Sequence, residues 1–401
     1  MKKLIQTGLL LLCAYASHAQ EQIRIWQADG ETRVTTEEIT FNNGSSLTIN
    51  GKTYETAAID SMAIVHTVTV TYSGGKALVD LGHAPGVKVE TDGAHVNLVS
   101  TNGKHELEFV LRGQSDCGSL TYTGPLKCKF YLDGLNLKSD RGAALDIECG
   151  KRVDLILNPG TDNVLADAAG GDQKAALYCK GHLEVEGSGS LTVTGNAKHG
   201  IATKEYLQLK KSTGKLTVSG AASDAIHAGQ YFLMNGGTLT LTGQKADGLQ
   251  VETLTLDDDV TPDASKENNG QCFVNGGTIT VAVDQPDVKG IKVPGNMTIH
   301  GGSFNITATG AGSKGISVGG NMLIDQEVGT TTIQIKATGG VYEDAVTDEE
   351  TRCMGIKVSG NLTINAGTVR VSNTGTGSRG IKIDGIYKKG AAASVSANIK
   401  N

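Results

Sequence analysis

A four-residue unit, Gly-Ile-Lys-Val at 355–358, recurs along the second half of the chain and constrains its fold more than any other feature. Its branched residue, which we call the anchor, lies 25, 23, 42, 25, 40 and 25 residues from the next: Ile201, Ile226, Leu249, Ile291, Ile316, Ile356 and Ile381. The two long gaps equal one period plus an insertion of roughly 15 to 17 residues. Self-similarity at such a period is typical of a solenoid.

Two further columns of apolar residues keep the same period, with the apolar residues two positions apart, as in a strand. One column comprises Leu207/Leu209, Phe232/Met234, Cys272/Val274, Met297/Ile299, Met322/Ile324 and Leu362/Ile364. The other comprises Leu191/Val193, Leu216/Val218, Leu239/Leu241, Ile279/Val281, Phe304/Ile306, Ile333/Ile335 and Val369/Val371. Gly-Gly pairs at 236–237, 276–277 and 301–302 supply corners with positive φ. These patterns predict an all-β parallel β-helix with three strands in each coil of about 23–25 residues.

The first 19 residues have the pattern of a cleaved secretory signal, with Lys2 and Lys3 before the apolar stretch 4–16. We therefore expect a secreted, cell-surface or periplasmic protein. No other apolar stretch is long enough for a transmembrane anchor. Removal of the signal would take two lysines from a net charge of −6 and leave −8, which argues against nucleic-acid binding.

Four parts of the chain are predicted. Residues 1–19 form the signal peptide, and 20–66 a small module of β-hairpins with turns at Asn43-Gly44 and Asn50-Gly51. Residues 67–125 are a β lead-in that caps one open end of the helix, and 126–401 are the β-helix itself.

Six cysteines remain after the signal, namely Cys117, Cys128, Cys149, Cys179, Cys272 and Cys353. A disulfide framework is conceivable in an exported protein. Several of these residues, however, occupy apolar positions of the repeat, and Cys179 aligns with Ile147. We expect buried free thiols. No Cys-x-x-Cys pair is present to indicate structural zinc.

The residue before each Gly-Ile corner is often charged, and stacking brings Asp224, Asp247 and Lys289 onto successive coils. Two stacked aspartates repel each other unless a positive charge lies beside them. An ion-pair ladder with His199 and Lys289 is one solution. The other is Ca²⁺, which takes six to eight oxygen ligands. Its candidate ligands are Asp224, Asp247, Asp284 and Asp287, with Glu252 as a further option.

A lysine beside calcium-bound uronate is also the minimal equipment for β-elimination, because the metal neutralises the carboxylate and the lysine abstracts the α-proton. Lys289 is the catalytic candidate if the protein is a lyase, and otherwise we assign no catalytic residue.

Two polar columns stack beside the second strand. Asn296, Asn321 and Asn361 are predicted to form an amide ladder that satisfies corner backbone groups. Tyr206 and Tyr231 form either a platform for a sugar ring or a stacked pair that covers the wall. We assign carbohydrate binding to Tyr206, Tyr231, His227 and Lys292. The acidic stretches 257–259 and 343–350 are expected to be solvated loops.

Several ordered motifs resemble a family of secreted bacterial carbohydrate-binding β-helices. They are the stretches 131–137, 142–151, 158–163, 198–201, 224–228 and 234–237, and the resemblance covers roughly 67–401. It implies a right-handed parallel β-helix similar to calcium-dependent pectate lyases, binding of cellulose or pectin-like polysaccharide, and calcium at Asp-Asp-Gly-Ile corners. Here the corners at 223–226 and 246–249 each carry one carboxylate fewer, and the lysine corners at 289 and 314 also resemble family corners.

The sequence thus favours a secreted, monomeric, non-catalytic protein that binds a plant cell-wall or other acidic polysaccharide and is stabilised by calcium. A calcium-dependent uronate lyase is the first alternative, and a structural or adhesion protein of the cell surface is the second.

Overall fold

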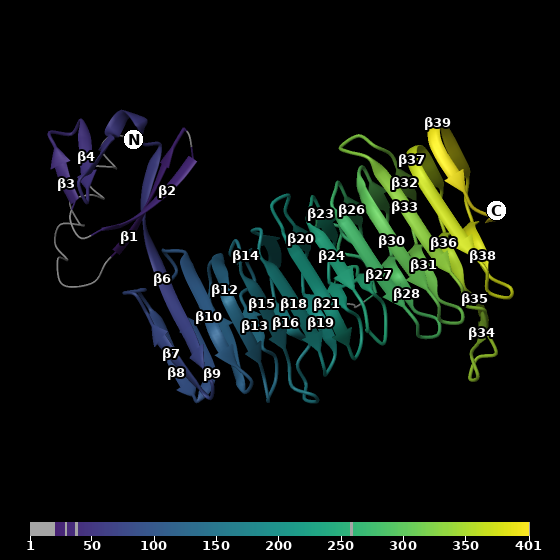
Figure 1. Cartoon of the computed structure of the whole chain (residues 1–401), viewed down its shortest axis with the longest axis horizontal. Coiled ribbons are helices and arrows are strands. Elements are labelled where there is room, and N and C mark those ends of the chain that lie inside the picture. The colour runs from purple at the N-terminus through teal and green to yellow at the C-terminus, as the bar shows by residue number, and fades with distance from the viewer. Residues whose placement is uncertain (1–20, 29, 37–38, 257–259, 401) are drawn as a thin grey trace.

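The computed structural model describes residues 21–28, 30–36, 39–256 and 260–400, and in these residues the chain is all-β (Figure 1). They contain no α-helix, and their one 3₁₀ turn is η2 (Thr56–Ala58). No helix among them is long and apolar enough to cross a membrane. The predicted signal peptide lies outside the described residues, so it stays a prediction.

An N-terminal group of antiparallel strands has its own small core around Ile23, Ile25 and Leu47. Its strands are β1 (Glu21–Gln27), β2 (Gly30–Thr36), β3 (Ile39–Asn42), β4 (Ser46–Ile49) and β5 (Lys52–Glu55). The long strand β6 (Ser61–Ser73) pairs with β1 through its first half and with the first coil through its second half. The predicted boundary between residues 66 and 67 therefore falls inside one continuous strand.

One wall of the remaining chain is a 13-stranded sheet in which β9 and the strands after it pair in parallel, each with its equivalent in the next coil. This sheet contains β8 (Val87–Asp92), β9 (Ala94–Ser100), β11 (Gly118–Thr123), β13 (Leu145–Glu148), β16 (Ala175–Cys179), β19 (His199–Thr203), β22 (Ile226–Ala228), β25 (Leu249–Val251), β28 (Lys289–Val293), β31 (Lys314–Val318), β36 (Met354–Val358), β38 (Arg379–Ile383) and β40 (Ile399–Lys400).

The other coil strands belong to a 22-stranded sheet that also includes β1, β2 and β6. They are β7 (Lys76–Asp80), β10 (Leu107–Ser115), β12 (Cys128–Lys138), β14 (Arg152–Leu157), β15 (Asp162–Ala166), β17 (His182–Glu186), β18 (Ser190–Gly195), β20 (Leu207–Leu209), β21 (Lys215–Ala221), β23 (Phe232–Met234), β24 (Thr238–Leu241), β26 (Cys272–Val274), β27 (Thr278–Val283), β29 (Met297–Ile299), β30 (Gly302–Ala308), β32 (Met322–Ile324), β33 (Thr331–Ala337), β37 (Leu362–Asn373) and β39 (Tyr387–Ser396). Two walls merge into this one sheet because β12 pairs with both β14 and β15, and β37 with both β32 and β33.

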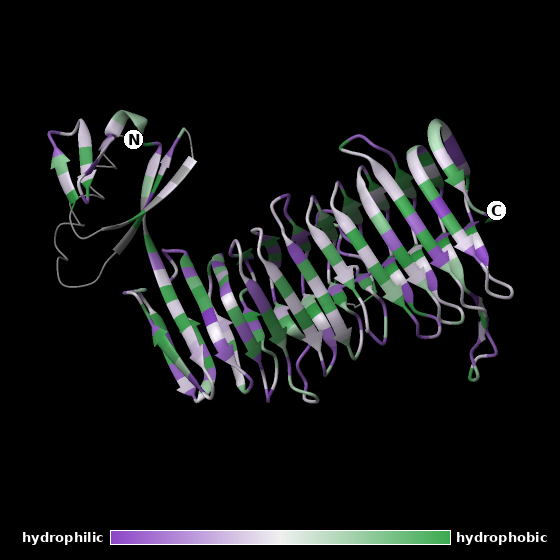
Figure 2. Ribbon diagram, in the orientation of Figure 1, coloured by the Kyte–Doolittle hydropathy of each residue, from purple (hydrophilic) through white to green (hydrophobic). Residues whose placement is uncertain are grey.

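The predicted columns are confirmed as cross-coil registers. Ile201 pairs with Ile226, which pairs with Leu249, and the series continues to Ile381. The anchors are at most 1% exposed, so the ladders form one continuous core. Apolar and polar bands consequently alternate along the strands (Figure 2).

The corners also follow the prediction. Gly237, Gly277 and Gly302 have φ values of 86°, 90° and 110°, which L side chains rarely adopt. In the asparagine column, Asn296 Oδ1 accepts the Asn321 backbone N–H at 2.8 Å, and Asn321 Oδ1 accepts that of Asn361 at 2.8 Å. The expected amide ladder is therefore confirmed.

Antiparallel strands β7 and β8 lie at the N-terminal end of the coils, and β39 and β40 add a last parallel layer at the other end.

All six described cysteines are free; five are buried and Cys117 is half-buried, as the prediction of thiols requires. The insertion that contains the acidic stretch 343–350 is more ordered than the expected loop, since β34 (Val341–Glu343) and β35 (Glu350–Arg352) pair as a hairpin. Residues 257–259 of the first insertion lie outside the described part.

Candidate functional site

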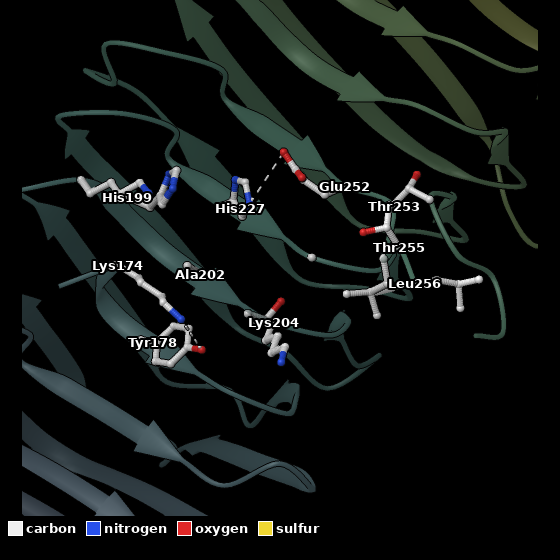
Figure 3. A pocket seen from close by; sticks show the side chains of 14 residues that line it. Lys174, Tyr178, His199, Ala202, Lys204, His227, Glu252, Thr253, Thr255 and Leu256 are labelled. Atoms are coloured by element: carbon white, nitrogen blue, oxygen red, sulfur yellow. Dashed lines mark hydrogen bonds and ion pairs between the residues drawn. The ribbon is translucent and has the colours of Figure 1, made fainter. Parts of the chain in front are cut away.

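A cleft of about 450 Å³ opens on the outer face of the 13-stranded sheet (Figure 3). Its floor comes from β16, β19 and β22, which present Tyr178, Ala202 and His227 from the position after each anchor. Lys174 donates a hydrogen bond to the Tyr178 hydroxyl at 3.1 Å. Glu252 lies opposite, with an oxygen 3.9 Å from His227 Nε2. The cleft thus combines an aromatic ring with both signs of charge.

The floor belongs to a longer line of outward side chains, the outer row. Strand pairing places its members on successive coils: Tyr178, Ala202, His227, Gln250, Lys292, Ser317, Lys357 and Lys382. Neighbouring strands of a sheet are about 4.8 Å apart, so the row presents a side chain at this interval. Its first half is aromatic and polar, and its second half carries three lysines.

Behind the cleft, Asp224 lies between two imidazoles. Its Oδ2 is 3.3 Å from His199 Nδ1 and 3.0 Å from His227 Nδ1, and the two rings stack at 4.5 Å. Burial, and secondarily the positive charge that His227 can carry, lower the pKa of His199 to about 4. Donor atoms of these three residues lie within 4.8 Å of one another, so they could hold a metal ion through two nitrogens and one oxygen.

The stacked aspartates bind backbone groups of the next coil. Asp224 Oδ1 accepts the Asp247 backbone N–H at 3.0 Å, and Asp247 Oδ1 accepts that of Lys289 at 2.7 Å. The second oxygen of Asp247 lies 3.5 Å from Lys292 Nζ, and burial raises the pKa of Asp247. Both carboxylates are buried and already partnered. This arrangement is closer to the predicted ladder than to an all-oxygen calcium cage, except that Lys292, and not the predicted Lys289 side chain, pairs with Asp247.

The other two predicted calcium ligands do not join that pair. Asp284 Oδ1 accepts a hydrogen bond from the Gln285 side chain. Asp287 lies between Lys289 and Lys314, with N–O distances of 3.3 and 3.0 Å. Among the described residues, two groups of three donors lie close enough together to hold a metal ion. Neither group includes Asp247, Asp284 or Asp287. The calcium assignment stays a prediction.

Lys289, the candidate base of a lyase, also donates to the Asp287 backbone carbonyl. Its ammonium group is thus engaged by two acceptors of one residue. Burial is the main cause that lowers the pKa of the neighbouring Lys314.

Tyr206 and Tyr231 stack with ring centroids 4.6 Å apart and an interplanar angle of 19°. His182 extends the stack, 4.3 Å from Tyr206. The Tyr206 hydroxyl donates to Glu184 at 2.7 Å, and burial raises the pKa of Tyr231 to about 12. Because the ring faces cover one another, this geometry favours the predicted alternative of a stacked pair. Neither tyrosine lines the cleft.

Of the residues that the sequence analysis selected, His227 lines the cleft and Lys292 lies outside it. The analysis missed Lys174, Tyr178 and Lys204, which line the cleft. The repeat held the signal for Tyr178, because it follows the anchor position just as His227 and Lys292 do. The first insertion also contributes: residues 253–256 form part of the cleft wall. We expected this insertion to be merely solvated, and its irregular length gave no register to place it.

Comparison with known proteins identifies the family of the chain. Residues 92–385 match the family of carbohydrate-binding domain-containing proteins, and the chain belongs to that family. A carbohydrate-binding domain-containing protein of Acetivibrio thermocellus is 26% identical over 171 residues, and the match covers 37% of this chain and 60% of the relative. The chain thus spans less than two thirds of that relative.

A solved structure, the gadolinium derivative of a polysaccharide lyase-like protein from C. thermocellum, is also similar. The alignment covers 84% of this chain and all of the other, with 17% identity and a TM-score of 0.46.

Proposed function

We propose that this protein binds an acidic polysaccharide, without cleaving it, along the outer row of the 13-stranded sheet. The observation that carries the proposal is the continuity of that row. A cleft with an aromatic ring and hydrogen-bonding groups at one end leads into Lys292, Lys357 and Lys382 at the other. An extended polysaccharide chain is long and narrow, and a continuous row of outward side chains has a shape that matches it.

The lysines favour an anionic glycan over a neutral one. The chain as a whole is acidic, with a net charge of −6, so cations gathered on one wall create a local field of opposite sign. Lys357 and Lys382 are direct register neighbours, although Asp384 pairs with Lys382. A carboxylate on the ligand would relieve the repulsion between these stacked ammonium groups.

Binding without cleavage fits the surroundings of the candidate base. Elimination needs an unprotonated amine beside the sugar's α-proton. Lys289 instead directs its amine to Asp287. The carboxylates of the two stacked aspartates accept backbone N–H groups and lie beside His199, His227 and Lys292.

The finer assignments belong to this proposal. We take the coils to be a right-handed parallel β-helix, the protein to be secreted, and calcium to brace it. The three parallel strands of each coil support the first of these, and the N-terminal pattern in the sequence supports the second. For calcium the supporting feature is the resemblance of the corners at 223–226 and 246–249 to the calcium-bearing corners of the family, and removal of calcium is one arm of the test.

The test is affinity electrophoresis of the mature protein through gels that contain a cellulose derivative, polygalacturonate or host-type glycans, each with and without EDTA. We expect retardation by polygalacturonate and no unsaturated product on incubation. Retardation that survives EDTA would remove calcium from the binding step. Migration unaffected by every glycan would contradict the proposal and favour a surface scaffold.

A further inference from the structure

A second cluster of metal-ligating side chains lies outside the cleft, at the corner after β29 and β32. His300 follows β29 and Asp325 follows β32, and the paired strand ends Ile299 and Ile324 bring them together. His300 Nδ1 lies 2.8 Å from Asp325 Oδ1 and 3.7 Å from Glu327 Oε2. Donor atoms of all three residues lie within 4.8 Å of one another.

The backbone holds this cluster in place. The Asp325 N–H donates to Ile299 O at 2.9 Å, and the carbonyl of His300 accepts from Val328 and Gly329 at 3.0 and 3.2 Å. The segment that carries Glu327 is therefore folded back onto the coil that carries His300. The three side chains come from two coils and a corner loop, so the fold brings them together.

An independent observation points to a missing partner. Asp325 is only 4% exposed, and its Oδ2 is buried with no hydrogen-bond partner in the part of the chain that the structure describes. A buried carboxylate oxygen without a donor is costly, and native structures rarely leave one. His300 contacts the other oxygen, so it leaves this deficit uncorrected. A bound cation would satisfy it.

The donor set selects the kind of cation. One imidazole nitrogen with two carboxylates suits Zn²⁺ and related transition metals, whereas Ca²⁺ takes oxygen ligands throughout. A cleft of about 470 Å³, lined in part by Asn275, Val328 and Gly329, adjoins the loop that carries Glu327. The exposed Glu327 side chain can move onto an ion without disturbing the core, since it is 72% exposed.

We propose that His300, Asp325 and Glu327 form a binding site for a divalent transition-metal ion of the Zn²⁺ type. The ion is held by the otherwise partnerless Oδ2 of Asp325, one oxygen of Glu327 and Nδ1 of His300, while Asp325 Oδ1 keeps the Glu327 backbone N–H. Binding weakens as the pH falls, because protonated imidazole is not a ligand and its proton must leave before the ion binds. This site is separate from the outer row and does not depend on glycan binding.

The test is calorimetric titration of the EDTA-treated, dialysed full chain with ZnCl₂ and, separately, CaCl₂. We expect one zinc site that Glu327→Gln and His300→Gln abolish or weaken by at least about tenfold, since loss of even an outer-shell partner has that effect. Glu343→Gln is the matched control, because it makes the same charge change at an exposed acid of the β34–β35 hairpin. Asp325→Asn should fold in EDTA and lose the zinc-induced rise in Tm.

Zinc could also bind at His199, Asp224 and His227, so only the difference between the wild type and these variants counts. The proposal is overturned if zinc stoichiometry and affinity are the same in the wild type, Glu327→Gln and His300→Gln. It is equally overturned if the chain binds no zinc, or if calcium rather than zinc is lost in the variants.

Discussion

Two corner columns of this molecule make the same bond with different chemistry. In the asparagine ladder, Asn296 and Asn321 accept the backbone N–H of the next coil through an amide oxygen. In the aspartate ladder, Asp224 and Asp247 accept it through a carboxylate oxygen. The asparagines are exposed, whereas the aspartates are 4% and 6% exposed.

The difference shows what the charge adds. An amide completes its ladder without a further partner, while each buried carboxylate needs a positive or hydrogen-bonding group for its second oxygen. His227 supplies it for Asp224 and Lys292 for Asp247, while His199 Nδ1 accepts the Asp224 backbone N–H. His227 and Lys292 also belong to the outer row. The aspartate ladder thus couples the stability of the coils to the side chains of the proposed binding face.

Asp224→Ala should have the largest effect, a loss of about 3 kcal/mol in the free energy of unfolding, because it leaves the buried Asp247 N–H and the His227 imidazole without their partner. Urea denaturation of the purified variant measures it. Asp224→Asn is the matched variant, since its amide oxygen can still accept the Asp247 N–H. If Asp224→Ala lost no more stability than replacement of an exposed asparagine of the other ladder, the two ladders would be equivalent and the charge would add nothing.

Acid should weaken the aspartate ladder through His199. Burial holds its pKa at about 4, below the ordinary value of 6.5, so in this range the unfolded chain binds a proton that the folded chain does not. Stability therefore falls as the pH drops from about 6.5 towards about 4. Urea titrations across this range should show a shallower slope for His199→Gln. The exposed His83→Asn serves as control, since asparagine tolerates the positive φ at this position, and an identical slope in all three proteins would contradict the assignment.

Asn321→Ala should have the smallest effect, about 1 kcal/mol, because it removes one exposed hydrogen bond to the Asn361 backbone, whose N–H can then bind water. The same urea assay measures this loss. A loss equal to that of Asp224→Ala would remove the contrast between the ladders.

The periodic part of this structure could be predicted from the sequence because each apolar column repeats at a fixed interval. The registers of Ile201 to Ile381 and the amide ladder of Asn296 follow directly from that interval. The partners of individual side chains could not be predicted, because the position of a charged residue in a column does not determine which of its oxygens accepts a backbone N–H. Asp224 and Asp247 were correctly placed on adjacent coils, but their bonds to the next coil's N–H became visible only in three dimensions.

The structure of the non-periodic segments could not be predicted from the sequence for another reason. The insertion at 252–270 and the corner loop at 325–330 have no equivalent in neighbouring coils, so no register placed residues 253–256 against the cleft or Glu327 beside His300. Both candidate sites depend on such a segment. Repeats made the scaffold predictable, and the departures from the repeat supply much of the chemistry.

Electrophoresis in a polygalacturonate gel, with two triple variants of equal charge, tests the central claim most directly. Lys292, Lys357 and Lys382 become Gln in one variant, and the exposed Lys76, Lys215 and Lys336, which lie off the outer row, become Gln in the other. If the outer row binds the glycan, the first variant loses its retardation and the second keeps that of the wild type. Equal retardation of the two variants would contradict the account.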